Sequence, residues 1–302
     1  KQLDRLHNLS CRVIEDYPGT KTWRKNVAEA EYYFASAAVE FNRDNFDRCE
    51  KLSVVVNPNT GQDHIDFDYI RLRSIKFITI KNEIDMLSKI TATSELAWGL
   101  LLSYLRHIPK GIEFSKQGNW AREKLTGQQI FEKKIGIIGM GRLGKITARI
   151  AKGFGCDIYF NDPYVNSNLG KKVELRYIFC ECDIIFIHTH LTPETTHLIG
   201  PELLNLPNRR PILVNTSRAK IVDEDAILDS LSNCKIEAYL TDVIDGEWLT
   251  TDEIQKLPIV RAAKTSEKVL ITPHIGGASH EGVKIARGHA LEMLMENING
   301  TI

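Results

Sequence analysis

The sequence predicts an α/β protein with two domains, one of which contains a doubly wound parallel sheet. Its 302 residues are enough for two domains, at roughly 100 to 200 residues per domain. Residues 133–275 alternate strand-like and helix-like segments, which is typical of a parallel sheet with helical crossovers. Residues 1–130 instead mix short apolar runs with helical patterns. We therefore expect two architectures joined in one chain.

The first part of the chain contains two expected strands and one long expected helix. Residues 52–57 (LSVVVN) and 75–80 (IKFITI) are short, rich in β-branched side chains and bounded by polar residues. Residues 93–108 place their apolar side chains on one helical face, and Pro109 and Gly111 are expected to end this helix. We expect the helix to serve as a hinge or as a contact between subunits.

The N-terminal residues do not follow the usual order of a βαβ unit. Residues 1–9 predict an amphipathic helix, and residues 11–14 predict a strand after it. Since such a unit normally opens with a strand, we expect one further strand upstream of Lys1.

Composition and charge argue against several classes of protein. The 39 basic and 39 acidic residues give no net charge, so no long-range field favours nucleic acid or an anionic membrane surface. The most apolar stretches, 98–105 and 182–191, are far shorter than the roughly 20 residues that span a bilayer. The six cysteines show no paired spacing, which favours a reducing cytoplasm, although three Asn-x-Ser/Thr tripeptides argue mildly for the opposite.

A glycine-rich loop follows the first strand of the second part. The strand-like run 133–139 (KKIGIIG) opens into residues 139–144 (GMGRLG), and a helical pattern comes next. In this context Gly139 permits a tight turn, Gly141 allows the backbone to approach a pyrophosphate, and Gly144 allows close packing of helix and strand. The pyrophosphate would bind at the N-terminus of the helix. The loop predicts dinucleotide binding, and the alternative is a structural glycine turn.

An acidic residue follows the next expected strand, residues 156–160. Asp162 lies 18 positions beyond Gly144, where a carboxylate accepts hydrogen bonds from both ribose hydroxyls and repels a 2′-phosphate. This arrangement favours NAD over NADP. The alternative is that Asp162 caps a helix or forms a turn before Pro163.

Charged side chains follow the remaining expected strands, which are residues 184–188, 212–215, 238–242 and 269–272. Arg218 follows one of these strands, Asp242 and Glu247 follow another, and His274 follows the last. Ligands of open α/β sheets bind beyond the carboxyl ends of the strands. Hydride transfer with a nicotinamide needs a proton donor or acceptor, and a fixed cation orients a substrate carboxylate. Taken singly, Arg218 could instead cap a strand and His274 could be an ordinary loop histidine.

The ordered motifs around these residues resemble the D-isomer-specific 2-hydroxyacid dehydrogenases. The resemblance covers about residues 50–290 and rests on the glycine-rich loop, on His188, and on the segments 60–66 (TGQDHID), 94–96 (SEL), 191–195 (LTPET), 215–223 (NTSRAKIVD), 241–247 (TDVIDGE) and 272–279 (TPHIGGAS). It implies two Rossmann-like domains. The NAD domain, residues 107–281, would be inserted in a smaller flavodoxin-like substrate domain formed by residues 1–106 and 282–302.

The resemblance also implies catalytic roles. His274 would be the general acid in reduction and the base in oxidation, and Glu247 would hydrogen-bond its ring and raise its pKa. Arg218 would bind the carboxylate and carbonyl oxygens of a 2-oxo acid and stabilise developing negative charge. Asp242 would orient the carboxamide of the nicotinamide. The expected activity is the NAD-dependent interconversion of a D-2-hydroxy acid and a 2-oxo acid.

Further binding residues follow from the same resemblance. Thr60 and Gly61 would offer backbone N–H groups to the substrate carboxylate, so that the reaction occurs in a cleft between the domains and requires closure. His274 and Arg218 would also contact the substrate. A cytoplasmic homodimer is expected. The residues implied in cofactor binding are Gly139, Gly141, Arg142, Leu143, Gly144, Asp162, His188, Thr216 and Asp242.

The chain departs from the family pattern at several positions close to these residues. Ala219 replaces the usual glycine after the arginine, Ile244 and Trp248 replace aromatic and proline residues near Glu247, and His190 stands where proline is common. These changes leave the choice of acid open. Glu247 disfavours the branch that oxidises formate, because that branch has glutamine as the acid-base partner.

Two other interpretations of the sequence compete with the dehydrogenase. A metal site is not expected, because the candidate ligands lack the paired spacing of a zinc site; they are His188, His190, His197, Cys180 and Cys182. A dinucleotide-sensing scaffold or corepressor with the same fold and little turnover is the second possibility. The intact set of arginine, glutamate and histidine favours the enzyme.

Overall fold

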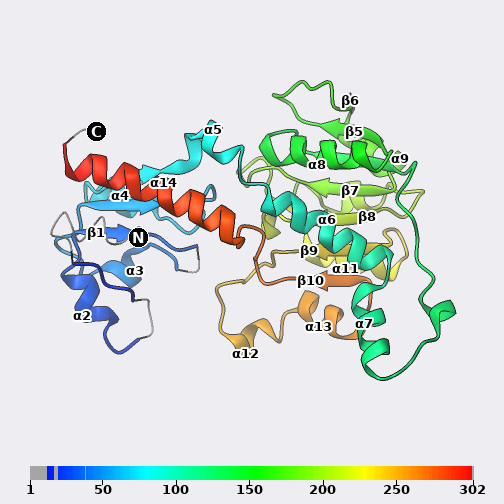
Figure 1. Cartoon of the computed structure of the whole chain (residues 1–302), viewed down its shortest axis with the longest axis horizontal. Helices are drawn as coiled ribbons and strands as arrows, with labels where there is room; N and C mark the ends of the chain where they lie inside the picture. Colours follow the sequence, from blue (N-terminus) through cyan, green and yellow to red (C-terminus); the bar gives the residue numbers. More distant parts are fainter. Residues whose placement is uncertain (1–11, 17–19, 38, 301–302) are drawn as a thin grey trace. The chain divides into compact units, whose positions relative to one another are not determined.

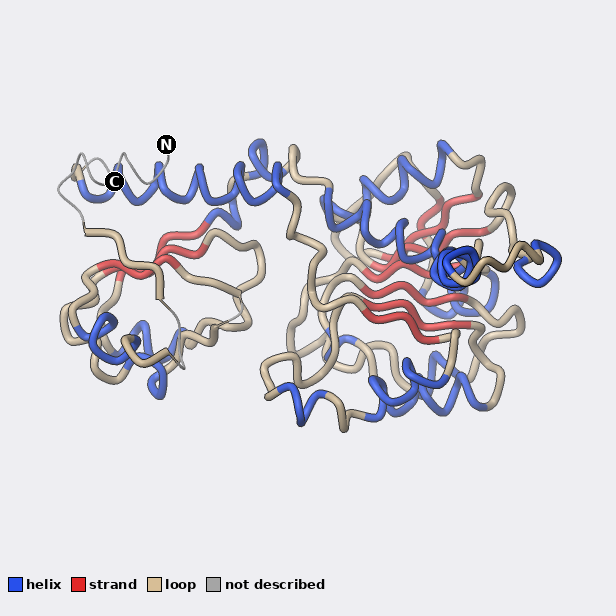
Figure 2. Tube along the Cα trace, turned by 60° about the horizontal axis from the view of Figure 1, so that its bottom comes forward, coloured by secondary structure: helices blue, strands red, loops and turns tan. Residues whose placement is uncertain are grey.

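The described residues fold into two parallel sheets, and helices cover both faces of each sheet (Figures 1 and 2). The structure is a computed structural model, and it describes residues 12–16, 20–37 and 39–300. The chain divides into two compact units. Thr91–Ser279 form the larger unit, and the residues up to Ile90 together with those from His280 onward form the smaller one. The larger unit is therefore an insertion in the sequence of the smaller unit.

The larger unit contains a seven-stranded sheet in which all neighbouring strands are parallel. Its strands are β4 (Lys134–Ile138), β5 (Asp157–Asn161), β6 (Lys171–Lys172), β7 (Ile184–Ile187), β8 (Ile212–Asn215), β9 (Ala238–Thr241) and β10 (Val269–Ile271). They are ordered β10-β9-β8-β7-β4-β5-β6. The order reverses between β4 and β7, which is where open α/β sheets bind ligands. The predicted α/β fold with a doubly wound sheet is confirmed.

Helices pack on both faces of this sheet. The helices of the larger unit are α6 (Ala92–Leu105), α7 (Ile108–Lys116), α8 (Arg142–Gly153), α9 (Leu175–Glu181), α10 (Pro201–Leu204), α11 (Glu224–Ser232), α12 (Thr251–Ile254) and α13 (Pro258–Thr265). Ile135 and Ile137 of β4 pack with α6 and α8, whereas Ile138 packs with α9 on the opposite face. Because both faces are buried, the strands are continuous apolar runs in the sequence.

The smaller unit contains a three-stranded parallel sheet with the order β1-β2-β3, and its strands are β1 (Tyr32–Phe34), β2 (Val54–Asn57) and β3 (Lys76–Thr79). Val55 packs on one face with Phe46, and Val54 packs on the other face with Leu291 of the C-terminal helix. The helices of this unit are α2 (Trp23–Ala28), α3 (Arg43–Phe46), α4 (Phe67–Leu72), α5 (Ile84–Leu87) and α14 (His280–Ile298).

The helix predicted at residues 93–108 consists of two helices. Helix α6 ends at Leu105, and His107 has a left-handed backbone with φ of 50°. Helix α7 begins at Ile108, with Pro109 in its first turn. Proline is tolerated there because the first N–H groups of a helix have no partner within the helix. The prediction that Pro109 and Gly111 end a helix is therefore wrong, since both lie within α7.

The observed division of the chain differs from the predicted domain boundaries at its first border. The predicted border after residue 106 assigns α6 to the smaller domain, whereas α6 belongs to the larger unit. The reason is its packing, since the indole of Trp98 lies 5.0 Å from the ring of Phe154 and 4.9 Å from that of Phe186, between ring centroids. The helix predicted for residues 1–9 lies outside the described residues. Residues 12–14, part of the predicted N-terminal strand, form no strand.

Across residues 12–16, 20–37 and 39–300, none of the helices combines the length and the apolar character needed to span a bilayer.

Candidate active site

The glycine-rich loop connects β4 to the N-terminus of α8, and two of its glycines are required by close contacts. Gly139 has φ of +92°, and a Cβ atom there would lie 2.6 Å from the carbonyl oxygen of His188. A Cβ on Gly144 would lie 2.0 Å from the carbonyl oxygen of Gly139. By contrast, a Cβ built on Gly141, the N-cap of α8, would meet no atom within 4 Å beyond its own chain neighbours. The loop thus packs tightly at its ends and leaves space at the helix N-terminus.

Asp162 follows β5 and lies against this loop. Its Oδ2 accepts a hydrogen bond from the backbone N–H of Met140 at 2.8 Å, and its Oδ1 accepts from the N–H groups of Tyr164 and Val165 at 2.9 Å each. The side chain of Asp162 therefore does stabilise a turn, and this turn contains Pro163. It also ties β5 to the glycine-rich loop, and a carboxylate with about four acceptor positions retains capacity for a ribose hydroxyl.

Two buried polar atoms beyond β7 and β8 have no hydrogen-bond partner among the described residues. They are Nδ1 of His188 and Oγ1 of Thr216. The other ring nitrogen of His188 lies 2.8 Å from Oγ1 of Thr147. Burial lowers the pKa of His188 to about 4, helped by the charge of Arg142, so the ring is neutral at neutral pH. Since buried polar groups are normally paired, these atoms and the space at Gly141 fit a bound dinucleotide.

His274 and Glu247 form a hydrogen-bonded pair. Nδ1 of His274 lies 2.7 Å from Oε2 of Glu247. The hydrogen bond that Nδ1 of His274 donates to Glu247 raises the pKa of His274, while partial burial and the charge of Arg218 oppose protonation. The side chain of His274 is 37% exposed to solvent, and that of Glu247 is 17% exposed. The imidazole is thus oriented by a carboxylate and still accessible to a ligand.

Asp242 fixes the segment that carries His274. It is 1% exposed, and its carboxylate accepts hydrogen bonds from Oγ1 of Thr272 at 2.6 Å and from the N–H groups of Ile275 and Gly276 at 2.9 and 2.7 Å. Its carbonyl oxygen accepts from the N–H of His274 at 2.9 Å. This positioning role was not expected from the sequence.

Asn215 fixes the segment that carries Arg218. The amide nitrogen of this fully buried side chain donates to the carbonyl oxygen of Arg218 at 3.0 Å. Its amide oxygen accepts from the N–H and the hydroxyl of Ser217 at 3.0 and 2.8 Å. Sequence reasoning did not select Asn215 as a site residue. The signal was present, because an amide at the end of a fully apolar strand must find partners.

The sheet brings together most of the predicted site residues of the larger unit. Arg218, Asp242 with Glu247, and His274 follow β8, β9 and β10, which are neighbours in the sheet. Since the strands are parallel, their carboxyl ends form one edge, and the glycine-rich loop lies at the same edge after β4. Thr60 and Gly61 belong to the smaller unit, where Nδ2 of Asn57 donates to the carbonyl oxygen of Gly61 at 2.9 Å. Their binding of substrate stays a prediction.

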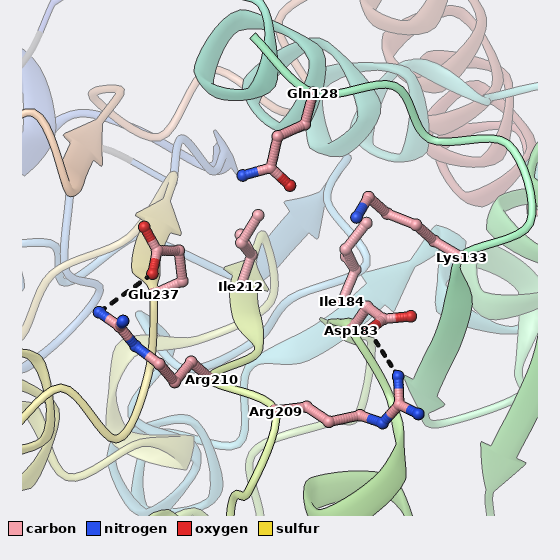
Figure 3. Close-up of a pocket in the computed structure, with 8 residues that line it drawn as sticks. All are labelled: Gln128, Lys133, Asp183, Ile184, Arg209, Arg210, Ile212 and Glu237. Carbon is pink, nitrogen blue, oxygen red and sulfur yellow. Dashed lines mark hydrogen bonds and ion pairs between the residues drawn. The ribbon is translucent and has the colours of Figure 1, made fainter.

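A pocket of about 160 Å³ lies at the opposite edge of the sheet (Figure 3). Its charged residues precede the strands, and four of them form two ion pairs: Arg209 with Asp183 at 3.2 Å, and Arg210 with Glu237 at 3.3 Å. The site at the carboxyl edge is the better candidate, because that is where ligands of such sheets bind. Among the described residues no group of three or more His, Cys, Asp and Glu side chains is arranged to hold a metal.

The sequence matches a known family over most of the larger unit. Residues 98–276 match the family described as D-isomer specific 2-hydroxyacid dehydrogenase, NAD binding domain. The chain is also 31% identical over 316 residues to glyoxylate reductase of Pyrococcus horikoshii. This alignment covers 97% of this chain and 89% of that relative. The chain belongs to the D-isomer-specific 2-hydroxyacid dehydrogenase family. The predicted family is therefore confirmed, and so are the NAD cofactor and the assignment as an oxidoreductase.

Two further comparisons concern the length of the chain and its fold. D-3-phosphoglycerate dehydrogenase of Methanocaldococcus jannaschii is 29% identical over 313 residues, which is 99% of this chain and 57% of that relative. This chain thus spans little more than half the length of that relative. The crystal structure of the TT0316 protein from Thermus thermophilus superposes with a TM-score of 0.84 at 27% identity, and covers 99% of this chain and 94% of that one.

Proposed function

We propose that this dehydrogenase reduces a 2-oxo acid to a D-2-hydroxy acid with NADH, and catalyses the reverse oxidation with NAD. The observation that carries the proposal is the 2.7 Å hydrogen bond between His274 and Glu247 at the sheet edge that also holds Arg218. The substrate class follows from relatives that are named glyoxylate reductase and D-3-phosphoglycerate dehydrogenase. The side chain of the preferred acid is left to experiment.

Each residue has a distinct task in this proposal. The cofactor supplies or accepts the hydride. His274 holds a proton on Nε2 and donates it to the substrate oxygen in reduction, while Glu247 keeps Nδ1 protonated and the ring oriented. Arg218 binds the substrate carboxylate and stabilises negative charge on the carbonyl oxygen. The backbone N–H groups of Thr60 and Gly61 bind the same carboxylate.

A substrate screen tests the proposal. The purified chain is mixed with NADH or NADPH and with glyoxylate, pyruvate, longer 2-oxo acids or a phosphorylated 2-oxo acid, and oxidation of the cofactor is followed by absorbance. We expect turnover of NADH with at least one of these acids, and a D-configured product. Tight NADH binding without turnover on any acid would contradict the proposal and favour the dinucleotide-sensing scaffold.

The pH dependence of reduction is expected to depend on Glu247. Reduction requires protonated His274, so kcat/KM falls as the pH rises through the pKa of that ring. Since Glu247 raises this pKa above its ordinary value of 6.5, the Glu247→Gln variant should lose activity at lower pH than the wild type. The measurement is kcat/KM for the best 2-oxo acid between pH 5 and about 9. If kcat/KM of Glu247→Gln falls over the same pH range as that of the wild type, Glu247 does not act with His274 in proton transfer.

Asp162 is expected to set the preference for NADH. Asp162→Asn removes the charge and keeps an acceptor for the N–H of Met140, whereas Asp162→Ala removes both. Each variant should lower the ratio of kcat/KM for NADH over NADPH by roughly ten-fold, or about 1.4 kcal/mol. The ratio is measured with one fixed 2-oxo acid. If it stays unchanged in both variants, Asp162 serves the glycine-rich loop alone.

We further propose that the enzyme is a homodimer in the cytoplasm, acting on small acids and not on nucleic acid. The support is an exposed apolar surface on α7 and the loop after it, where Ile108, Ile112 and Trp120 are 43%, 49% and 88% exposed. Apolar surface of this kind is typical of a contact between proteins. The cysteines in the described part of the chain are free thiols, which suits a reducing compartment.

A further inference from the structure

Two catalytic segments meet at the N-terminus of α11. Glu224 is the first residue of this helix, and its Oε1 accepts a hydrogen bond from the backbone N–H of Asp245 at 3.1 Å. A second link joins the same segments, because Nζ of Lys220 lies 3.8 Å from the carboxylate of Asp245. A side chain six residues after Arg218 therefore holds the backbone two residues before Glu247.

The chain turns sharply between Asp245 and Glu247. Gly246 has φ of +98°, which is a left-handed conformation that favours glycine. Any other residue at this position would be strained by the backbone conformation, so Gly246 fixes a tight turn directly before Glu247. The position of Glu247 therefore depends on where Asp245 is held, and the hydrogen bond from the N–H of Asp245 to Glu224 holds it.

The carboxyl group of Glu224 lies in an environment that disfavours its charged form. The side chain is half-buried, and burial raises its pKa to about 7, with further contributions from the nearby charges of Asp245 and Asp225. A carboxyl group on the first turn of a helix can point into water without losing its favourable interaction with the helix dipole. Here it is turned toward the loop, where its hydrogen bond offsets part of the burial cost.

We propose that Glu224 is a positioning residue of the dehydrogenase: it ties the segment of Arg218 to the segment of Glu247 and so keeps the carboxylate of Glu247 against His274. The proposal rests on the proposed function for its kinetic consequence. Its structural consequence, a change at the ring of His274, is measurable without turnover. The remaining charged groups that face this ring are Arg218 and Asp242.

The test compares three variants of the full chain. Glu224→Ala removes the acceptor, and Glu224→Gln keeps a neutral acceptor of the same size. Asp225→Ala alters the next residue of α11, whose exposed side chain forms no hydrogen bond with the described residues of the loop. We expect Glu224→Ala to lower kcat roughly ten-fold and to leave the Kd for NADH within about two-fold of the wild type. Glu224→Gln should recover most of this loss, and Asp225→Ala should behave as the wild type.

The decisive measurement is the titration of the His274 ring by NMR with histidine labelled at Cε1, assigned by the signal missing from a His274→Asn variant. We expect the pKa of His274 to fall toward its ordinary value of 6.5 in Glu224→Ala and not in Asp225→Ala. If Glu224→Ala lowers the unfolding temperature and leaves this pKa unchanged, the residue is merely structural and the proposal is overturned. Should no variant and no wild-type sample reduce a 2-oxo acid, the proposed function fails, while the titration still decides the role of Glu224.

Discussion

Replacement of His274 is expected to lower kcat for reduction of a 2-oxo acid by roughly 10²- to 10⁴-fold, the usual contribution of a general acid. The reason is the proton on Nε2 of His274, a ring that Glu247 orients through a hydrogen bond at Nδ1. The Kd for NADH should remain within about two-fold of the wild type, because the glycine-rich loop follows a different strand. Steady-state kinetics and a fluorescence titration measure the two quantities.

The choice of variant matters because His274 has a left-handed backbone with φ of 52°. Alanine is strained in this conformation, whereas asparagine tolerates it, so His274→Asn separates the loss of the acid from a disturbed loop. His197 offers a matched control, since it is an exposed histidine of the same unit with φ of 51°. His197→Asn should retain wild-type kcat. If His274→Asn retains more than about a tenth of the wild-type kcat, His274 is not the general acid.

The parts of this site that were predictable from the sequence are those with a local signal. The strands of the larger unit are short apolar runs, and the glycine-rich loop has fixed spacing, so both were visible before the structure. Strands β1 and β6, of three and two residues, were not predicted. Such short elements are stabilised by pairing with a neighbouring strand and carry little periodicity of their own.

The contacts that position the catalytic side chains were not predictable in the same way. The hydrogen bonds of Asp242 to Thr272 and Gly276 join residues about 30 positions apart. The bond between Glu224 and Asp245 spans 21 positions. No periodicity links such residues, and the register of β8, β9 and β10 decides which of them meet. Arg218, Glu247 and His274 could be selected without knowledge of the register, because a cation that binds a carboxylate and an acid-base pair require these types of residue.

Gly141→Ala is expected to weaken NADH binding without destabilising the fold. A Cβ at this position would meet no atom within 4 Å beyond its own chain neighbours, and φ of −70° is open to alanine, so the unfolding temperature should not fall. If the pyrophosphate lies against this backbone, the added methyl group occupies its place. Overpacking of this kind costs about 1–3 kcal/mol, or roughly 5- to 150-fold in the Kd for NADH.

Two other glycines of the same segment make the result interpretable. Gly144→Ala places its Cβ 2.0 Å from the carbonyl oxygen of Gly139, so it should lower both the unfolding temperature and the affinity for NADH. Gly153→Ala at the end of α8 meets no atom within 4 Å and should be neutral or slightly stabilising, with unchanged affinity. The two variants are expected to differ in their affinity for NADH only if a ligand binds at the N-terminus of α8. Equal affinities of these two variants for NADH would therefore place the pyrophosphate elsewhere.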